Sequence, residues 1–426
     1  MTTALILIVF IVGYACIMFE HNIKIDKAGS ALVTGTLCWA IYALSGIGEH
    51  NVEEQLMHHM SDIASILFFL LGAMTIVELI ATHDGFTIIT NRIKTTSKVR
   101  LLWLISLLTF FLSAILDNLT TAIVMTAMTG RILEEKKDRL WFAGMIVIAA
   151  NAGGAWSPLG DVTTTMLWIG NQITALNIMK QLIFPSLAVS LVPLIIVSFK
   201  FRGAQVTQTS ESNGSSVSAN ERNTIFFSGL GLLLFVPVFK TVTHLPPFMG
   251  MMLALGVLWF VTSLVHFQKD YDERKKFSIA RAVARIDTPS ILFFLGILLA
   301  VTALQSYGLL NQLAEFLTNT LPNDYAIGIA LGLLSSIVDN VPLVAAAQGM
   351  YSLAQFPTDH HFWEFLALTT GTGGSAIIIG SAAGVAVMGI EKIDFMWYMK
   401  KISLLALAGF VAGVLVFLLQ ANLGGY

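Results

Sequence analysis

Residues 62–70 have the sequence Asp-Ile-Ala-Ser-Ile-Leu-Phe-Phe-Leu, and residues 287–295 have the sequence Asp-Thr-Pro-Ser-Ile-Leu-Phe-Phe-Leu. Seven of these nine positions are identical, at an offset of 225 residues. Two further pairs of motifs follow in the same order, at offsets of 222 and 220 residues: Asp117-Asn118 with Asp339-Asn340, and Gly153-Gly154 with Gly373-Gly374. Apolar runs resemble one another by chance, but three ordered landmarks at a nearly constant offset indicate an internal repeat.

The composition is that of a membrane protein. Of the 426 residues, 56 % are hydrophobic and 12 % are charged, and the mean hydropathy is +0.77. A soluble domain carries about 25 % charged residues, so a soluble enzyme is excluded. The net charge of −2 gives no indication of nucleic-acid binding. Cys16 and Cys38 lie in apolar runs, which predicts buried thiols rather than a disulfide framework.

Apolar segments predict an all-α protein that crosses the lipid bilayer many times, since a spanning helix needs about 20 apolar residues. The candidate spans are 3–19, 29–47, 63–82, 101–116, 141–150, 162–170, 181–199, 224–239, 248–266, 288–305, 326–338, 364–370, 376–389 and 402–420. A hydrophilic stretch, residues 203–222, is rich in Ser, Asn, Gln and Thr and predicts a flexible linker between two halves.

The distribution of Lys and Arg predicts the direction of these spans. The basic segments are 85–100, 131–139 and 267–285, whereas 48–62, 306–325 and 351–363 contain no Lys or Arg. Because basic loops face the cytoplasm, segment 101–130 begins and ends on the cytoplasmic side. Segment 326–350 begins and ends on the other side. Both segments are therefore predicted to be re-entrant hairpins, and they enter from opposite faces.

The same rule makes the two repeats inverted, because 63–82 runs inward and 288–305 runs outward. Inverted repeats with broken helices are typical of secondary transporters. The predicted organisation is: N-terminal scaffold helices 1–61; repeat 1 at 62–202, with its hairpin at about 101–130 and a broken helix at about 141–172; the linker 203–222, on the cytoplasmic side; scaffold helices 223–286; and repeat 2 at 287–426, with its hairpin at about 326–350 and a broken helix at about 364–389.

Asp117 and Asp339 each follow an apolar run, at matching positions of the two repeats. An ionised Asp at membrane depth is expensive unless it is paired, solvated or ion-bound, so we predict one site lined from both sides. Each Asp could also simply cap the helix that follows, and the two interpretations are compatible. Asn118, Thr120, Thr121 and Asn340 lie beside these two aspartates in the sequence. Their side-chain oxygens suit a hard cation, although the two threonines could instead donate to helix carbonyls.

Residues 151–161, Asn-Ala-Gly-Gly-Ala-Trp-Ser-Pro-Leu-Gly-Asp, interrupt an apolar segment with three glycines and a proline. Residues 369–375 interrupt the corresponding segment of the other half. The breaks favour an ion site, whereas the glycines themselves fit tight helix packing equally well. The predicted ion- and proton-binding residues are Asp117, Asn118, Thr120, Thr121, Asn151, Gly153, Ser157, Asp161, Asp339, Asn340, Thr372 and Ser375, with Na⁺ at Asp117, Asn118, Asp339 and Asn340. Glu78 is a candidate proton carrier, or else a residue near the cytoplasmic interface.

Together these motifs resemble the NhaD-type sodium/proton antiporters of the ion transporter superfamily. The residues that carry the resemblance are 117–122, 151–165 and 336–343, and the similarity extends over almost the whole chain. Superfamily members that carry dicarboxylates have a Ser-Asn-Thr signature at the hairpin tips. This chain has Asp117-Asn118 and Asp339-Asn340 there, and this difference favours a cation over an anion as the substrate. The resemblance also implies a homodimer, formed through a scaffold domain, and a transport domain that moves as an elevator.

The predicted function is secondary active exchange of Na⁺ or Li⁺ for H⁺, in which ion and proton compete for buried carboxylates. No cofactor is expected, and the expected location is a bacterial inner membrane. The alternative is a cation-coupled carrier of a dicarboxylate or oxyanion, because helix N-termini attract anions. That alternative would favour an intramembrane Arg or Lys, and the central motifs contain none. A membrane sensor without transport activity is a third interpretation, but no soluble domain is attached.

Overall fold

The computed structural model describes residues 2–46, 51–90, 95–206, 217–270, 274 and 277–424. Within these residues the chain is built from helices, and an isolated β-bridge joins Ser97 to Gln205. Seven of the described helices are long and apolar enough to cross a membrane. The predicted all-α polytopic architecture is therefore confirmed. Parts of the segments 48–62, 85–100 and 267–285 and much of the linker 203–222 lie outside the described residues.

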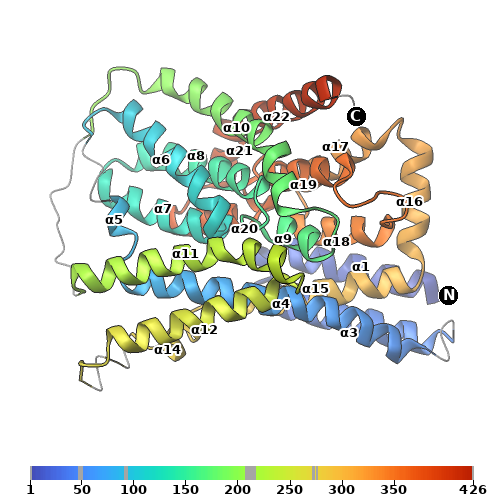
Figure 1. The fold of residues 1–426 in the computed structure, drawn as a ribbon. Helices are drawn as coiled ribbons and strands as arrows, with labels where there is room; N and C mark the ends of the chain where they lie inside the picture. Colours follow the sequence, from blue (N-terminus) through green and yellow to red (C-terminus); the bar gives the residue numbers. More distant parts are fainter. Residues whose placement is uncertain are drawn as a thin grey trace.

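The helices form two layers (Figure 1). Mostly long helices form the lower layer, here called the long-helix layer: α1 (Thr2–Met18), α3 (Lys27–Leu44), α4 (Val52–Thr82), α11 (Ala219–Thr243), α12 (Pro247–Val265) and α15 (Thr288–Ser306). Several shorter or interrupted helices form the upper layer, here called the broken-helix layer: α6 (Lys98–Leu116), α7 (Asn118–Ile132), α8 (Lys136–Ala155), α9 (Val162–Ile169), α10 (Ala175–Lys200), α17 (Asp324–Leu334), α18 (Asn340–Met350), α19 (His361–Gly373), α20 (Ala382–Glu391), α21 (Phe395–Lys401) and α22 (Ser403–Gly424).

Short elements connect these helices. They are α2 (Glu20–Ile23), α5 (Thr87–Thr90), α14 (Ile279–Val283), α16 (Leu309–Thr320) and the 3₁₀ turn η1 (Ile378–Gly380). Helix α16 stands across the direction of the long helices at one end of the molecule (Figure 1). The first helix of each repeat, α4 or α15, packs in the long-helix layer, and the hairpin helices and broken helices pack in the other layer.

The helix breaks have local causes. Asp117 separates α6 from α7, and its side chain caps α7; Asp339 caps α18 in the same way. Between α8 and α9 the chain runs through Pro158, which has no N–H to donate to a helix. Between α19 and α20 it forms η1 instead of a continuous helix. Each break therefore ends at a new helix N-terminus, and the cap is an Asp or Ser side chain.

Close helix packing is equivalent in the two repeats. A methyl group on Gly153 would overlap the carbonyl oxygen of Phe110, and one on Gly373 would overlap that of Gly332. Hydroxyl groups tie the same helix pairs together: Ser113 Oγ donates to the Ala150 carbonyl at 2.6 Å, and Ser335 Oγ donates to the Thr370 carbonyl at 2.7 Å. The glycines therefore have a packing role in both halves.

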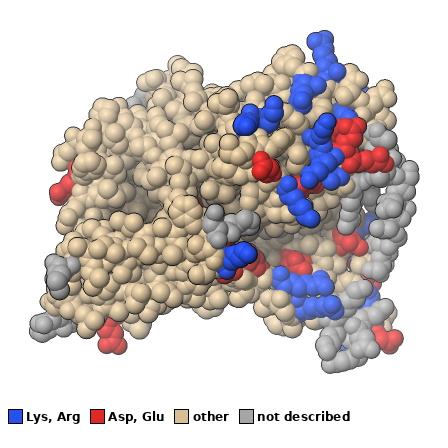
Figure 2. All heavy atoms as spheres, turned by 180° about the vertical axis from the view of Figure 1, so that it is seen from behind, with Lys and Arg blue, Asp and Glu red and all other residues tan. Residues whose placement is uncertain are grey.

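On the face that Figure 2 shows, Lys and Arg gather at one end of the molecule, on the right of that view; this end lies on the left of Figure 1. Several ion pairs lie there, among them Lys98 Nζ to Asp138 Oδ2 at 2.5 Å and Lys269 Nζ to Glu221 Oε2 at 2.7 Å. The rule that basic loops remain on the cytoplasmic side assigns this end, here called the basic end, to the cytoplasm. Helix α16 lies at the opposite, far end.

Candidate functional site

A cavity of about 50 Å³ lies between the two layers, near the helix breaks. Helices α4 and α15 contribute Phe69, Leu70, Ala73, Met74, Ser290 and Phe294 to its wall; the broken-helix layer contributes Asp117, Asn118, Leu119, Thr120, Leu159, Asp161, Val162, Thr165, Asp339, Asn340, Val341 and Ala382. A buried water needs about 10–15 Å³ on this measure, so the cavity suits an ion with a few waters.

Asp161 is the centre of the polar network. Its side chain caps α9 by accepting from the Thr163 N–H at 3.1 Å, and the residue is 2 % exposed. Asn118 of the first hairpin donates its amide Nδ2 to Asp161 Oδ2 at 2.8 Å. Asn340 of the second hairpin donates to the same oxygen at 3.1 Å. The two repeats therefore meet at one carboxylate, which belongs to the first repeat.

Asp117 occupies the tip of the first hairpin in an unusual backbone conformation, with φ 75° and ψ 158°. Residues other than glycine rarely adopt this region, which costs about 1–3 kcal/mol. Thr120 holds the side chain by donating its backbone N–H to Oδ1 and its hydroxyl to Oδ2, each at 2.8 Å. The two predicted roles for Thr120 are an ion ligand and a donor to a helix carbonyl; its hydroxyl donates to Asp117 instead of to a helix carbonyl. Thr121 is buried, and its Oγ1 has no hydrogen-bond partner among the described residues.

Asp339 occupies the tip of the second hairpin with an ordinary backbone, φ −50°. It caps α18 by accepting from the Val341 N–H at 3.2 Å. Two residues of the long-helix layer, Tyr14 and Lys27, lie near enough to interact with it electrostatically. The Lys27 ammonium also lies 4.7 Å from the ring centroid of Phe293, next to the cavity residue Phe294.

Asn151 connects the two broken helices. Its Oδ1 accepts from Asn118 at 3.1 Å, and its Nδ2 donates to the hydroxyls of Ser375 and Ser381, both at 2.9 Å. All three partners of this fully buried amide lie in or beside the breaks. The sequence analysis named Asn151 and Ser375 among the ion-binding residues, and the structure joins them in one network with Ser381, the cap of α20.

Seven predicted residues lie outside the cavity wall: Thr121, Asn151 and Ser375, described above, and Gly153, Ser157, Thr372 and Glu78. Ser157 Oγ accepts from the Leu159 N–H at 3.3 Å within the turn before α9, and the Thr372 hydroxyl donates to the Leu368 carbonyl at 2.6 Å. Gly153 packs against α6. Glu78 accepts from the Thr82 hydroxyl at 3.1 Å and lies 3.7 Å from Arg285 at the basic end. The structure places Glu78 in an ion pair there, not beside the three aspartates.

The cavity also contains residues that sequence reasoning did not assign to a site. Apolar wall residues of α4, such as Phe69 and Met74, gave no chemical signal. Ser290 could have been found from the sequence, because it is one of the seven identical repeat positions. Its hydroxyl donates to the side chain of Asp287, which caps α15. Thr165 lines the cavity while its hydroxyl donates to the Pro158 carbonyl at 2.8 Å.

The charge balance of the cavity favours a cation. Four helices begin at its wall, with Asn118, Val162, Asn340 and Ala382 as their first residues. A helix N-terminus carries about half a positive charge, but three of these four helices are capped by a carboxylate: Asp117, Asp161 and Asp339. Among the described residues that line the cavity, none is Lys, Arg or His. Carboxylate and amide oxygens of this kind bind hard cations.

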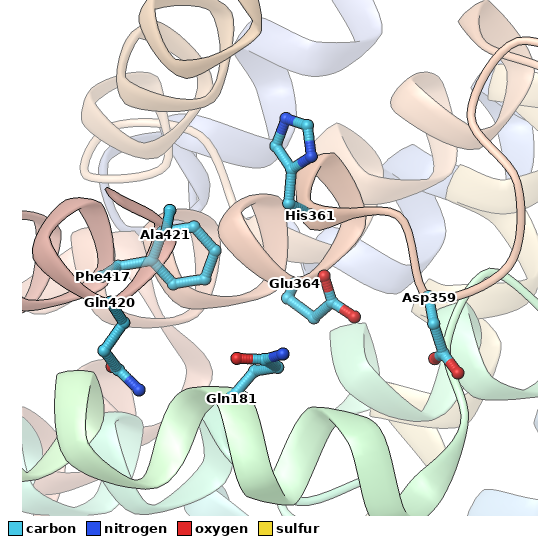
Figure 3. A pocket seen from close by; sticks show the side chains of 7 residues that line it. All are labelled: Gln181, Asp359, His361, Glu364, Phe417, Gln420 and Ala421. Atoms are coloured by element: carbon cyan, nitrogen blue, oxygen red, sulfur yellow. The ribbon is translucent and has the colours of Figure 1, made fainter. Parts of the chain in front are cut away.

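A second, smaller cavity of about 20 Å³ lies near the far end between α10, α19 and α22 (Figure 3). The buried Glu364 accepts from Asn177 Nδ2 at 2.5 Å, and Asp359 accepts from the backbone N–H and the hydroxyl of Thr174. The His361 ring points away from both carboxylates in Figure 3. This cavity shares no wall residue with the central one.

Comparisons with known proteins agree on a transporter. The sequence model of the citrate transporter family (CitMHS) matches residues 5–373. The sodium/proton antiporter 1 of Arabidopsis thaliana is 46 % identical, over 98 % of this chain and 72 % of the relative. The Na⁺/H⁺ antiporter NhaD of Vibrio cholerae is 32 % identical, over 97 % of this chain and 91 % of the relative. The solved structure of the YdaH transporter of Alcanivorax borkumensis has a TM-score of 0.59 at 11 % identity, covers 90 % of each chain, and shows a similar fold.

Proposed function

This chain belongs to the family that the citrate transporter model describes and, within it, to the NhaD-type sodium/proton antiporters, and we propose that it exchanges Na⁺ for H⁺ at the central cavity. It is a multi-pass membrane protein and a transporter rather than an enzyme. The observation that carries the assignment of the site is the set of three aspartates at one cavity between the layers.

Ion and proton compete for the same oxygen atoms in the proposed mechanism. Na⁺ binds between Asp161 and the hairpin-tip carboxylates of Asp117 and Asp339. When the ion leaves, a proton from the other side of the membrane binds a carboxylate in its place. The site therefore does not cross the membrane while all its carboxylates are charged and no ion is bound. The amide groups of Asn118 and Asn340 hold Asp161 in place, because each donates a hydrogen bond to it. No separate coupling device is then needed.

An anion carrier is the second candidate, supported by the family name and by the four helix N-termini at the cavity. A citrate or dicarboxylate would have to sit among three aspartate carboxylates with no basic group among the described lining residues. Like charges at such short range repel strongly in a medium of low dielectric constant. The cation is therefore the favoured substrate.

The direct test measures proton movement in inverted membrane vesicles with a pH-sensitive dye. Addition of Na⁺ or Li⁺ at neutral and alkaline pH should dissipate a preformed proton gradient only in vesicles that contain this protein, and K⁺ serves as the comparison ion. If no cation has an effect at any pH, while labelled citrate or a dicarboxylate accumulates in the same membranes, the carboxylates serve a different substrate and the anion carrier is correct.

Several finer features belong to the same proposal. The hairpins α6–α7 and α17–α18 are re-entrant, and the broken-helix layer moves as an elevator against the long-helix layer, which acts as the scaffold and forms a homodimer. The position of the cavity between the two layers supports such a movement. Li⁺ is a second transported ion. The proposed location is a bacterial inner membrane, although two relatives from Arabidopsis thaliana share 46 % and 42 % identity with this chain.

A further inference from the structure

Lys240 reaches from one layer to the other at the far end of the molecule. It lies in the last turn of α11, in the long-helix layer, and its Nζ donates to the Trp168 carbonyl oxygen at 2.7 Å. The same Nζ lies 3.3 Å from Asn171 Oδ1 and 4.9 Å from the ring centroid of Trp168. One cation therefore contacts the backbone, the ring and the following turn of a helix in the opposite layer.

The helix that Lys240 holds is the one that carries Asp161. Helix α9 has eight residues and spans about 12 Å, with Asp161 as the cap of its N-terminus. Its last carbonyl groups accept backbone N–H groups of the following turn, Gly170 to Met166 at 2.9 Å and Asn171 to Trp168 at 3.3 Å. The C-terminus of the helix still attracts a cation, because it carries a partial negative charge. Lys240 binds the carbonyl of Trp168, and Gln348 Nε2 of α18 binds that of Met166, at 3.2 Å. Fixing the outer end of this short, stiff helix also fixes the position of Asp161 at its inner end.

The same contact adjoins the wall of the cavity. The Trp168 ring, 1 % exposed, packs edge to face against Phe69 of α4, with centroids 6.4 Å apart. Phe69 is itself part of the cavity wall. Trp168 thus packs against a residue of the cavity wall, and Lys240 lies against Trp168.

We infer that Lys240 is a positioning residue for Asp161: it fixes the outer end of α9 to the long-helix layer, and its release accompanies exposure of the cavity to the far side. The inference rests on the proposed exchange function, because it concerns how the same site changes sides. Lys240 itself contacts neither the cavity nor the three aspartates. It acts through Trp168 and the rigid α9.

Two variants and a matched control test this role. Lys240→Met keeps the apolar stem but removes the ammonium group, and Lys240→Arg keeps a cationic donor. Lys200→Met is the control, because the Lys200 ammonium lies 4.7 Å from the Trp141 ring centroid but both residues belong to the broken-helix layer. Each change is combined with Ala73→Cys in the cavity wall, after replacement of Cys16 and Cys38 by Ala. A membrane-impermeant thiol reagent is then applied to the far side.

Lys240→Met is expected to raise the labelling rate of the cysteine at position 73 about fivefold or more, whereas Lys240→Arg and Lys200→Met stay near the parent rate. In proteins without the reporter cysteine, Lys240→Met should also raise the apparent KM for Na⁺ on the cytoplasmic side, because fewer carriers face that side. Unchanged labelling and KM in Lys240→Met would refute the inference.

Trp168→Phe provides an independent variant if Lys240→Met fails to insert, because it keeps the backbone carbonyl and removes the indole ring. A smaller rise in labelling is expected, and labelling at the parent rate would count against the inference. The labelling experiment does not depend on transport. Absence of Na⁺-dependent proton movement in the unmodified protein would therefore contradict the proposed function without deciding the role of Lys240.

Discussion

The break between α8 and α9 and the break between α19 and α20 have the same packing contacts but different polar side chains. In both, a glycine lets the helix touch the carbonyl of a hairpin helix, and a serine hydroxyl ties the same pair of helices together. The cap of the following helix is Asp161 in the first repeat and Ser381 in the second. Where the first has the amide of Asn151, the second has Gly371. The repeat thus preserves the packing that makes a cavity, while only the first repeat has a carboxylate as the cap after its broken helix.

The hairpin tips differ in a related way. Asp117 has a strained backbone and is held by two hydrogen bonds from Thr120, whereas Asp339 has an ordinary backbone and one hydrogen bond to the helix that it caps. The residue equivalent to Thr120 is Pro342, which has no N–H or hydroxyl to donate. The difference indicates that the first hairpin supplies a rigid carboxylate and the second a less constrained one.

Replacement of any of the three cavity aspartates by Asn should produce the largest effects, and Asp161→Asn is the first of these variants. The amide is the same size and can still accept from the Thr163 N–H, but the negative charge that both hairpins contact is lost. We expect a loss of Na⁺-dependent proton movement of at least about a hundredfold, which corresponds to about 2.8 kcal/mol. Asp394→Asn is the matched control, because Asp394 caps α21 in the same way, away from the cavity. Activity within twofold of the unmodified protein in both variants would contradict the central role of Asp161.

Asp117→Asn and Asp339→Asn are each expected to abolish exchange in the same vesicle assay while the protein still inserts into the membrane. Removal of either carboxylate leaves the ion with one fewer charged ligand at a site where unbalanced charge is expensive. Membrane insertion is checked by quantifying the purified protein from equal amounts of membrane. Normal exchange in both variants would exclude the hairpin tips from the site.

Gly153→Ala and Gly373→Ala test the close helix contact that both breaks have in common. Each added methyl group would overlap a backbone carbonyl oxygen, that of Phe110 or that of Gly332. Overpacking of this kind costs about 1–3 kcal/mol, so both variants should unfold at lower temperature in detergent, by similar amounts. A large shift in one variant and none in the other would show that the two packing contacts are not equivalent. Gly256→Ala is the control, since open space surrounds that position.

Thr120→Val should weaken the first hairpin without destroying the site. Asp117 Oδ2 loses the hydroxyl donor but keeps the backbone donor on Oδ1, and a single hydrogen bond to a charged group is worth about 1.5–3 kcal/mol. We expect the apparent KM for Na⁺ to rise about tenfold, with a smaller change in maximal rate. Pro342→Ala in the second hairpin, which removes no side-chain donor, should leave the KM nearly unchanged.

The smallest effect concerns acid stability at the basic end, where a pair of histidines joins the first helix of repeat 1 to a scaffold helix. His83, directly after α4, stacks on His266, directly after α12, with ring centroids 5.1 Å apart. The pKa of His266 is lowered from 6.5 to about 4, mainly by burial and also by the neighbouring His83 and Lys269, whereas Glu221 opposes them. Burial also lowers the pKa of His83.

Because these pKa values are lower in the folded state, the unfolded state binds more protons between about pH 6.5 and pH 4. Stability should therefore be intact above pH 6.5 and fall as the pH approaches 4, by at most about 1.4 kcal/mol per pH unit for each histidine. The melting temperature in detergent, measured across this range, should depend less on pH in His266→Phe, which keeps a stacked ring. An unchanged pH dependence in this variant would assign the acid sensitivity to other groups.

Much of the architecture was predictable because its signals are local. Apolar runs set the spans, Pro158 and the glycine pairs interrupt two of them, and Asp117 and Asp339 mark the starts of α7 and α18. The repeat and its inverted direction follow from short identical motifs and from loop charge. Each of these signals lies within a few residues of the element that it describes.

The arrangement within the site depended on tertiary structure, since its contacts join residues that are far apart in the chain. The sequence identified three aspartates, but only the packing of two hairpins against α9 made Asp161 the one that both Asn118 and Asn340 contact. The same packing paired Glu78 with Arg285 and brought Lys240 to the end of α9. Hydropathy, charge and helix-breaking residues are properties of a segment, whereas these contacts are set by how two layers of helices fit together.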